Sequence, residues 1–354
     1  MTETVLVTGG FGLVGSAAVR QLAADGRRIV VADLETAANV KKVKALPNGV
    51  EVRWTDLTDP DQVQRVMSDV APAAIIHLAA IIAPAIYRMP KVARRVNVDA
   101  TATLVRVAEA QPTPPRFVHA SSNAVFGPRN PHLTPEPLTA DDPMRPCDIY
   151  SGTKAQAEEI VQSSKLDWVV LRFGGVLSTE LAALPLSTDA MLFESALPSD
   201  NRVQTVDVRD VGFACAAATT ADVAGEILLI AGDDSHRHCY GDLAPALVSA
   251  LGIPGAIPPG RPGDPSSDKD WFVTDWMDTT RAQEALKFQH HSWTDIMAEL
   301  SAKFWFMRHW GRLLAPVVRE VMKRRSAYWN APGQYADPWG AIRAKLGEPA
   351  PDQP

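Results

Sequence analysis

The segment Val7-Thr8-Gly9-Gly10-Phe11-Gly12-Leu13-Val14-Gly15 places four glycines between an apolar run and a run with helical spacing. Glycine costs conformational entropy inside a strand or a helix, so such a cluster needs a physical reason. One reason is a tight turn that brings bare backbone up to a phosphate at a helix N-terminus. The alternative is an ordinary glycine-rich turn, and the glycine spacing alone leaves both open.

The residues around the glycines favour a dinucleotide site. A β-branched run at residues 5–8 comes before them, and apolar residues recur with helical spacing over residues 13–24. A second strand is expected at residues 28–32, and it ends at Asp33. Asp33 lies 18 residues after Gly15, close to the roughly 20 expected for a carboxylate that binds the adenosine ribose.

Each residue of this motif has an expected task. Gly9 permits the tight turn, Gly12 lets the pyrophosphate approach, and Gly15 allows close helix packing. A carboxylate at Asp33 binds both ribose hydroxyls but repels a 2′-phosphate, and Leu34, not arginine, follows it. We therefore predict NAD, rather than NADP, as the cofactor.

The order of predicted elements indicates an α/β fold. Strands alternate with helical or loop segments, which implies parallel pairing and a doubly wound Rossmann sheet. Further strands are expected at residues 50–54, 73–77, 117–121, 168–172 and 226–231. We expect the sheet to carry a smaller, partly helical C-terminal part that binds substrate.

We divide the chain accordingly. Residues 1–173 form the NAD-binding Rossmann domain, to which a later strand and helix return near residues 203–232. The other expected parts are a substrate-binding part (174–202 and 233–293), an amphipathic helical extension (294–346) and a disordered tail (347–354).

Composition narrows the function classes. The chain has 354 residues and a net charge of −6, which does not suggest a nucleic-acid partner. Three widely spaced cysteines form neither a disulfide framework nor a metal pair, so we expect no metal site and a cytoplasmic location. The expected partners are a small-molecule substrate and a second copy of the chain, as a homodimer.

Tyr150 and Lys154 are candidates for proton transfer. They lie four residues apart in a predicted helix and therefore share one face. An ammonium beside a phenol favours the phenolate, so we expect Lys154 to lower the pKa of Tyr150 and make it a general acid or base. An exposed helix pair is the alternative for these two residues taken alone.

The pair is accompanied by an ordered series of motifs. These are TGGFGLVG (8–15), Asp33, Asp56-Leu57, IHLAA (76–80), NVDAT (97–101), ASSNAVFG (120–127), VDVRDVG (206–212) and DTTRAQEALKF (278–288). The series, which runs from residue 4 to about 290, resembles the extended branch of the short-chain dehydrogenase/reductase superfamily, which contains NAD-dependent epimerases, dehydratases and related dehydrogenases.

The resemblance implies roles for individual residues. Tyr150 would exchange a proton with the substrate oxygen, Ser122 would hold that oxygen, and Lys154 would bind the nicotinamide ribose. Asn97 is expected to be a structural helix residue near the cofactor rather than a catalytic group. The remaining cofactor-binding residues would be Gly9, Phe11, Gly12, Leu13, Gly15, Asp33, Leu34, Asp56, Leu57, Leu78, Ala79, Ala80, Phe173 and Val176.

The sequence departs from the family pattern at the substrate side. Asn123 and Ala124 stand where the family's dehydratases carry an Asp-Glu pair, so we expect no dehydration. Residues 177–197 offer a diphosphate no cation, which leaves Arg202 and Arg209 as the argument for a sugar nucleotide. The apolar wall of the pocket is expected from Leu181, Leu184, Leu186, Met191, Leu192 and Phe193, with Trp271, Phe272 and Trp276.

We therefore expect an NAD-dependent oxidoreductase that interconverts a secondary alcohol and a ketone on a largely apolar substrate. One alternative is an NAD-dependent sugar-nucleotide epimerase. Another, from a different class, is a non-catalytic NAD-binding sensor or scaffold, which the complete set of Ser122, Tyr150 and Lys154 argues against.

The extension is basic. Residues 294–330 contain seven Lys or Arg and three Asp or Glu, and apolar residues recur there with helical spacing. A helix packed on its own domain or on a second copy is one interpretation. Weak contact with a membrane surface is the other.

Overall fold

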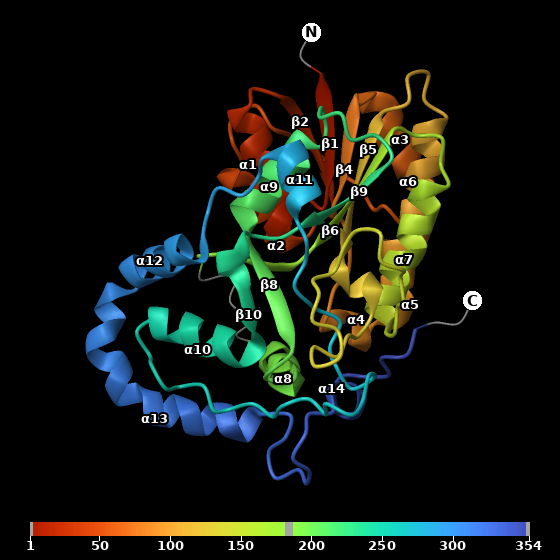
Figure 1. Cartoon of the computed structure of the whole chain (residues 1–354). Coiled ribbons are helices and arrows are strands. Elements are labelled where there is room, and N and C mark those ends of the chain that lie inside the picture. The colour runs from red at the N-terminus through yellow and green to blue at the C-terminus, as the bar shows by residue number, and fades with distance from the viewer. Residues whose placement is uncertain (1–2, 181–186, 352–354) are drawn as a thin grey trace.

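The computed structural model describes residues 3–180 and 187–351. A seven-stranded sheet in the order β3-β2-β1-β4-β5-β6-β9 forms the centre of the molecule, and every neighbouring pair in it is parallel (Figure 1). Its strands are β1 (Thr4–Thr8), β2 (Arg28–Asp33), β3 (Glu51–Trp54), β4 (Ala74–His77), β5 (Arg116–Ser122), β6 (Trp168–Phe173) and β9 (Glu226–Ile230). The predicted doubly wound α/β fold is confirmed.

Helices cover both faces of this sheet (Figure 1). Alternate strand residues point to opposite faces, so each buried strand contributes to two apolar layers. One layer is closed by α1 (Leu13–Ala24), α9 (Val208–Ala217) and α11 (Thr280–Leu286). The other is closed by α3 (Pro60–Val70), α6 (Ala100–Glu109) and α7 (Ile149–Gln162). The short helices α2 (Ala37–Lys42), α4 (Ala85–Arg88) and α5 (Pro90–Arg94) lie in the connections.

A second, smaller sheet begins where the chain leaves β6. β7 (Gly175–Leu177) pairs in parallel with β8 (Arg202–Asp207), and β10 (Arg237–Cys239) pairs with β8 in antiparallel fashion. Gly174 allows this change of sheet, because a Cβ there would come within 2.6 Å of the Gln204 carbonyl oxygen. β8 therefore belongs to the smaller sheet, whereas α9 packs on the main sheet and β9 pairs with β6 within it.

The remaining helices lie beyond the carboxyl ends of the main strands or on the outer edge of the molecule (Figure 1). They are α8 (Thr188–Ala196), α10 (Tyr240–Ala250), α12 (Trp293–Lys303), α13 (Arg308–Arg325) and α14 (Pro338–Lys345). Residues 347–351, for which the sequence suggested disorder, return to the start of α7, where Ile149 N–H donates to the Pro349 carbonyl oxygen (2.7 Å). No helix among the described residues is long and apolar enough to cross a membrane.

Candidate active site

The glycine motif forms a tight turn between β1 and α1. Gly9 has a φ of +68°, and a Cβ there would come within 2.8 Å of the Ala79 backbone. A Cβ on Gly15 would collide with the Gly9 carbonyl oxygen. Helix α1 can therefore lie this close to the turn only because residue 15 is glycine. Gly12 is the N-cap of α1 and makes no side-chain capping bond. The turn therefore presents bare backbone and a helix N-terminus, which suit a phosphate.

Asp33, at the carboxyl end of β2, faces this turn. Its Oδ2 accepts a hydrogen bond from Phe11 N–H (3.1 Å), and its Oδ1 accepts from Leu34 N–H (2.8 Å) and from the amide of Asn39 (3.3 Å). Lys42 Nζ donates to the Phe11 carbonyl oxygen (2.8 Å), which also holds the turn. The carboxylate is thus held in place beside the phosphate turn, as a ribose-binding acid requires.

The other residues predicted for the cofactor follow the carboxyl ends of neighbouring strands. Leu13 and Leu34 are about half exposed, and Thr8 Oγ1 bonds His77 Nδ1 (2.7 Å) and accepts from Leu78 N–H (3.2 Å). The rest are Asp56 and Leu57 after β3, Ala79 and Ala80 after β4, Asn97 in a π-helical turn, Phe173 at the end of β6 and Val176 in β7. The strands of the main sheet are parallel, so Asp56, Leu57, Leu78, Ala79, Ala80 and Phe173 follow their carboxyl ends at one edge of that sheet, whereas Val176 belongs to β7 of the smaller sheet.

The three candidate catalytic residues lie at the same edge. Ser122 ends β5, and Tyr150 and Lys154 lie in the first turns of α7. Ser122 and Lys154 are buried, and Lys154 Nζ donates to the Ala120 carbonyl oxygen of β5 (2.8 Å). Strand β5 and helix α7 therefore bring the serine, the tyrosine and the lysine together.

The pKa of Tyr150 differs from our expectation. Burial raises the pKa of Tyr150 to about 12, although a hydrogen bond with the Ser122 side chain acts to lower it. Burial also lowers the pKa of Lys154 to about 8. The net shift of the Tyr150 pKa is therefore upward, opposite to the expected lowering, because burial, with a smaller contribution from the Asp148 carboxylate, outweighs the hydrogen bond from Ser122.

Sequence reasoning missed the residues that orient α7. Asp148 is the N-cap of this helix, forms a capping box with Ser151 and accepts a hydrogen bond from Tyr87 Oη (2.7 Å). Asn97 Oδ1 accepts from Ile81 N–H (2.8 Å), and its amide donates to the Ile81 carbonyl (2.9 Å), which supports the structural role expected for Asn97. The motif Asp-x-x-Ser at residues 148–151, which includes Tyr150, is the sequence signal for the cap.

A buried ion pair connects α7 to the sheet. Arg172 on β6 forms a bidentate pair with Glu158, with Nη2 to Oε2 at 2.7 Å. Ser121, next to the catalytic serine, donates to the same carboxylate. Removing either charge would leave the other charge buried without an ion-pair partner. We therefore regard the pair of Glu158 and Arg172 as the contact that holds α7 in position against the strands.

Asn123 has an unusual environment. Its side chain is buried, its Oδ1 lies 3.5 Å from Ser122 Oγ, and its Nδ2 finds no hydrogen-bond partner among the described residues. A buried donor without a partner is costly, so such a group often has a functional reason. The sequence marked Asn123 only as a departure from the dehydratase pattern.

Part of the expected apolar wall does adjoin Tyr150. Leu192 and Phe193 of α8 and Phe272 belong to one apolar cluster with Tyr150, and Trp339 of α14 joins it. Trp271 and Trp276 are outside that cluster. Their indole N–H groups donate to the carbonyls of Ser267 and His238. Met191 is only partly buried. Leu181, Leu184 and Leu186 lie outside the described residues.

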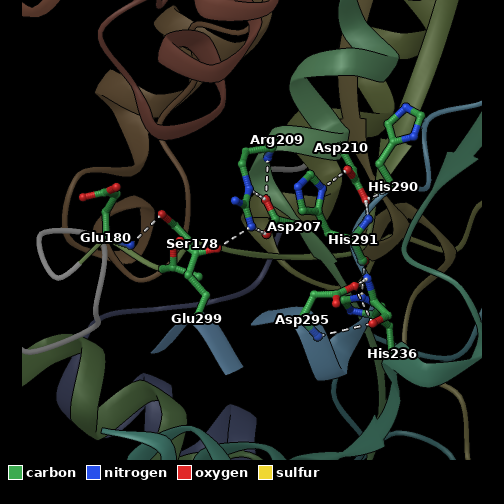
Figure 2. A network of polar contacts seen from close by, with 12 residues as sticks. Ser178, Glu180, Asp207, Arg209, Asp210, His236, His290, His291, Asp295 and Glu299 are labelled. Carbon is green, nitrogen blue, oxygen red and sulfur yellow. Dashed lines mark hydrogen bonds and ion pairs between the residues drawn. The ribbon is translucent and has the colours of Figure 1, made fainter. Parts of the chain in front are cut away.

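The two arginines that favour a sugar nucleotide are both bound within the chain. Arg209 pairs with Asp207 (2.6 Å) and Glu299 (2.9 Å), as Figure 2 shows. These carboxylates raise the pKa of Arg209 further above its ordinary value. Arg202 donates to the carbonyls of Pro131 (2.9 Å) and Thr134 (3.0 Å) and lies over the Trp276 ring.

The residues predicted to bind the cofactor have the chemistry that NAD requires. Gly9 and Gly15 leave a cradle that a Cβ would fill, Asp33 supplies a ribose acceptor, and Lys154 supplies a cation at the far end of the same edge. No group of three or more metal-binding side chains occurs among the residues that the structure describes.

Comparisons with known proteins agree with this geometry. Residues 5–231 match the model of the NAD dependent epimerase/dehydratase family, which confirms the predicted family and, at the level of that family, NAD as cofactor. A rice (Oryza sativa subsp. japonica) protein, UDP-glucose 4-epimerase 4, is 33% identical over 182 residues, which cover 48% of each chain. A dTDP-glucose 4,6-dehydratase of Neisseria gonorrhoeae is 31% identical over 175 residues, 46% of this chain and 50% of that one.

A solved structure is similar over more of the chain. A short-chain dehydrogenase/reductase superfamily protein from Agrobacterium tumefaciens, crystallised with bound NAD, is 25% identical with a TM-score of 0.64. The match covers 89% of this chain and 99% of that one. The chain spans only about half the length of the curated relatives it matches.

Proposed function

We propose a function from one premise: the chain belongs to the NAD-dependent epimerase/dehydratase family. The proposed function is that of an NAD-dependent epimerase, which inverts a secondary alcohol carbon of a nucleotide sugar. The observation that carries it is the joint placement of Ser122, Tyr150 and the glycine turn at one sheet edge. Curated relatives that are UDP-sugar epimerases support the choice of substrate class.

The residues divide the work between them. Ser122 Oγ would hold the substrate oxygen, and Tyr150, with a pKa of about 12, is protonated at neutral pH and ready to donate to a ketone oxygen. For the oxidation step Tyr150 must first be deprotonated, so that the phenolate can accept the alcohol's proton and later return that same proton to the ketone oxygen. Lys154, with a pKa of about 8, is mostly cationic at neutral pH and would favour this phenolate. When bound, NAD would take a hydride from the alcohol carbon and return it to the other face of the ketone.

A direct assay tests this proposal. Purified protein with NAD is incubated with UDP-glucose, UDP-galactose and UDP-arabinose, and the sugars are separated by chromatography while absorbance follows NADH. We expect an epimeric sugar and no net NADH, since oxidation and reduction occur on one cofactor. Net NADH from alcohols, with no turnover of any nucleotide sugar, would contradict the epimerase.

The second candidate is the dehydrogenase acting on a largely apolar alcohol or ketone. Two observations favour it: Tyr150 adjoins an apolar cluster with Phe193 and Phe272, and Arg202 and Arg209 are bound within the chain. A diphosphate buried without free cations would carry a heavy desolvation cost. The same assay with cyclic and aromatic alcohols distinguishes this candidate. The homodimer, the cytoplasmic location and the absence of dehydration stay predictions.

A further inference from the structure

Helix α13 carries an apolar face that is exposed in the part of the chain that the structure describes. Its exposed apolar residues recur at intervals of three and four, which places them on one face of the helix. They are Trp310 (69% exposed), Leu313 (71%), Leu314 (49%), Val317 (63%) and Val321 (42%). A soluble monomer rarely leaves such a contiguous apolar row in water.

A different face of α13 packs on the molecule. Gly311 and Ala315 are buried, and a Cβ on Gly311 would collide with the Gly252 carbonyl oxygen. Figure 1 shows α13 along the outer edge of the C-terminal part, far from the seven-stranded sheet. The interpretation of a helix packed wholly on its own domain is therefore insufficient, and the apolar face remains open.

The ends of this face differ in chemistry. Trp305 and Phe306, both more than half exposed, come directly before the helix. Arg324 follows Val317 by seven residues and Arg325 follows Val321 by four, so both arginines continue the apolar face at its C-terminal end. Lys323 Nζ lies 5.3 Å from the centre of the exposed Trp329 ring.

We propose that α13 docks the protein on an anionic lipid bilayer, with this apolar face in the headgroup region. Aromatic rings favour that region, and long arginine side chains reach from it to lipid phosphates. Residues 294–330 carry a net +4, whereas the rest of the chain carries −10. The charge of this segment is therefore opposite to that of the chain as a whole and complementary to an anionic surface.

Charge also favours lipid over a second copy. A two-fold contact would bring two segments of the same +4 charge together, which costs electrostatic energy. An anionic surface instead attracts Arg325 and Arg324, although Arg324 also has an exposed pair with Glu320 (2.8 Å), while the apolar row leaves water. The proposal concerns a surface remote from Tyr150 and does not depend on the proposed function.

Vesicle binding tests the proposal. The full chain is sedimented with phosphatidylcholine vesicles that contain or lack phosphatidylglycerol, at low and high salt. We expect binding to the anionic vesicles only, weakened by salt. The double variant Leu313→Gln/Val317→Gln should lose binding, and Arg324→Gln/Arg325→Gln should weaken it about tenfold or more.

The controls use exposed residues of the same types away from α13. Val40→Gln/Leu133→Gln should bind like the wild type, and so should Arg20→Gln/Arg65→Gln. Equal binding to both vesicle types, or to neither, overturns the proposal. A second result would also overturn it: light scattering shows that the wild type is a dimer, and Leu313→Gln/Val317→Gln makes it a monomer but leaves lipid binding unchanged.

Discussion

At the scale of single residues, burial sets the protonation of the candidate site: it raises the pKa of Tyr150 to about 12 and lowers that of Lys154 to about 8. Spacing and residue type were enough to propose Gly9, Asp33 and Tyr150 as site residues, because turn geometry and helix periodicity act locally. The pKa of Tyr150 was not predictable, since it depends on burial by segments distant in the chain. Asn123 likewise becomes unusual only when the fold removes it from water.

Tyr150→Phe is expected to lower turnover by about 10² or more, because a positioned acid or base contributes roughly 10²–10⁴. NAD affinity should stay nearly unchanged, since the phosphate turn and Asp33 are intact. Steady-state rates with the substrate found in the epimerase assay, and titration with NAD, measure both quantities. Tyr335→Phe, at an exposed tyrosine, is the matched control. Near-normal turnover in Tyr150→Phe would rule out the proposed role.

Asp33→Asn tests the choice of dinucleotide. The wild type should bind NAD well ahead of NADP, because a carboxylate repels the 2′-phosphate. The amide keeps the shape and loses the charge, so the preference for NAD should fall by about tenfold or more. Fluorescence titration with both cofactors gives the ratio, and Glu35→Gln, at the exposed acid two residues on, should leave it unchanged. An unaltered ratio in Asp33→Asn would show that this carboxylate does not face the ribose.

At the scale of elements, periodicity predicted the main sheet and its helices. Buried parallel strands appear in the sequence as continuous apolar runs, which makes them predictable. The strands expected at residues 5–8, 28–32 and 168–172 accordingly lie within β1, β2 and β6. Periodicity could not assign β8 to a sheet, because pairing is a long-range property. Its place in the smaller sheet follows from the close approach at Gly174.

Glu158→Gln tests the link between α7 and the strands. The change leaves Arg172 buried without a charged partner, so the free energy of unfolding should fall by about 3–5 kcal/mol. Chemical denaturation measures this loss, and Glu159→Gln, at an exposed neighbour, should cost well under 1 kcal/mol. Replacing both Glu158 and Arg172 by Met should recover much of the stability. A Glu158→Gln protein as stable as the wild type would show that the pair does not hold α7.

At the scale of the whole molecule, residues 342–349 pack beside the candidate site. Ile342 and Leu346 of the α14 region belong to the same apolar cluster as Ile149 and Tyr150. Pro349 then accepts the hydrogen bond from Ile149 N–H. The sequence suggested disorder after residue 346, because a short segment rich in proline has no periodicity that reveals a distant docking site.

Ile342→Ala is expected to disturb the candidate site from this far end of the chain. Ile342 is fully buried, so truncation should lower the free energy of unfolding by about 2–5 kcal/mol. Turnover should fall as well, because Ile342 shares its cluster with Tyr150, whereas NAD affinity should hold, since the glycine turn lies outside that cluster. Arg343→Ala, which breaks only the exposed pair with Glu348, should change neither quantity by more than a small factor. Denaturation, NAD titration and turnover on the same preparations separate these effects. A loss of NAD affinity as large as the loss of turnover would mean that the C-terminal segment supports the whole fold rather than the region around Tyr150.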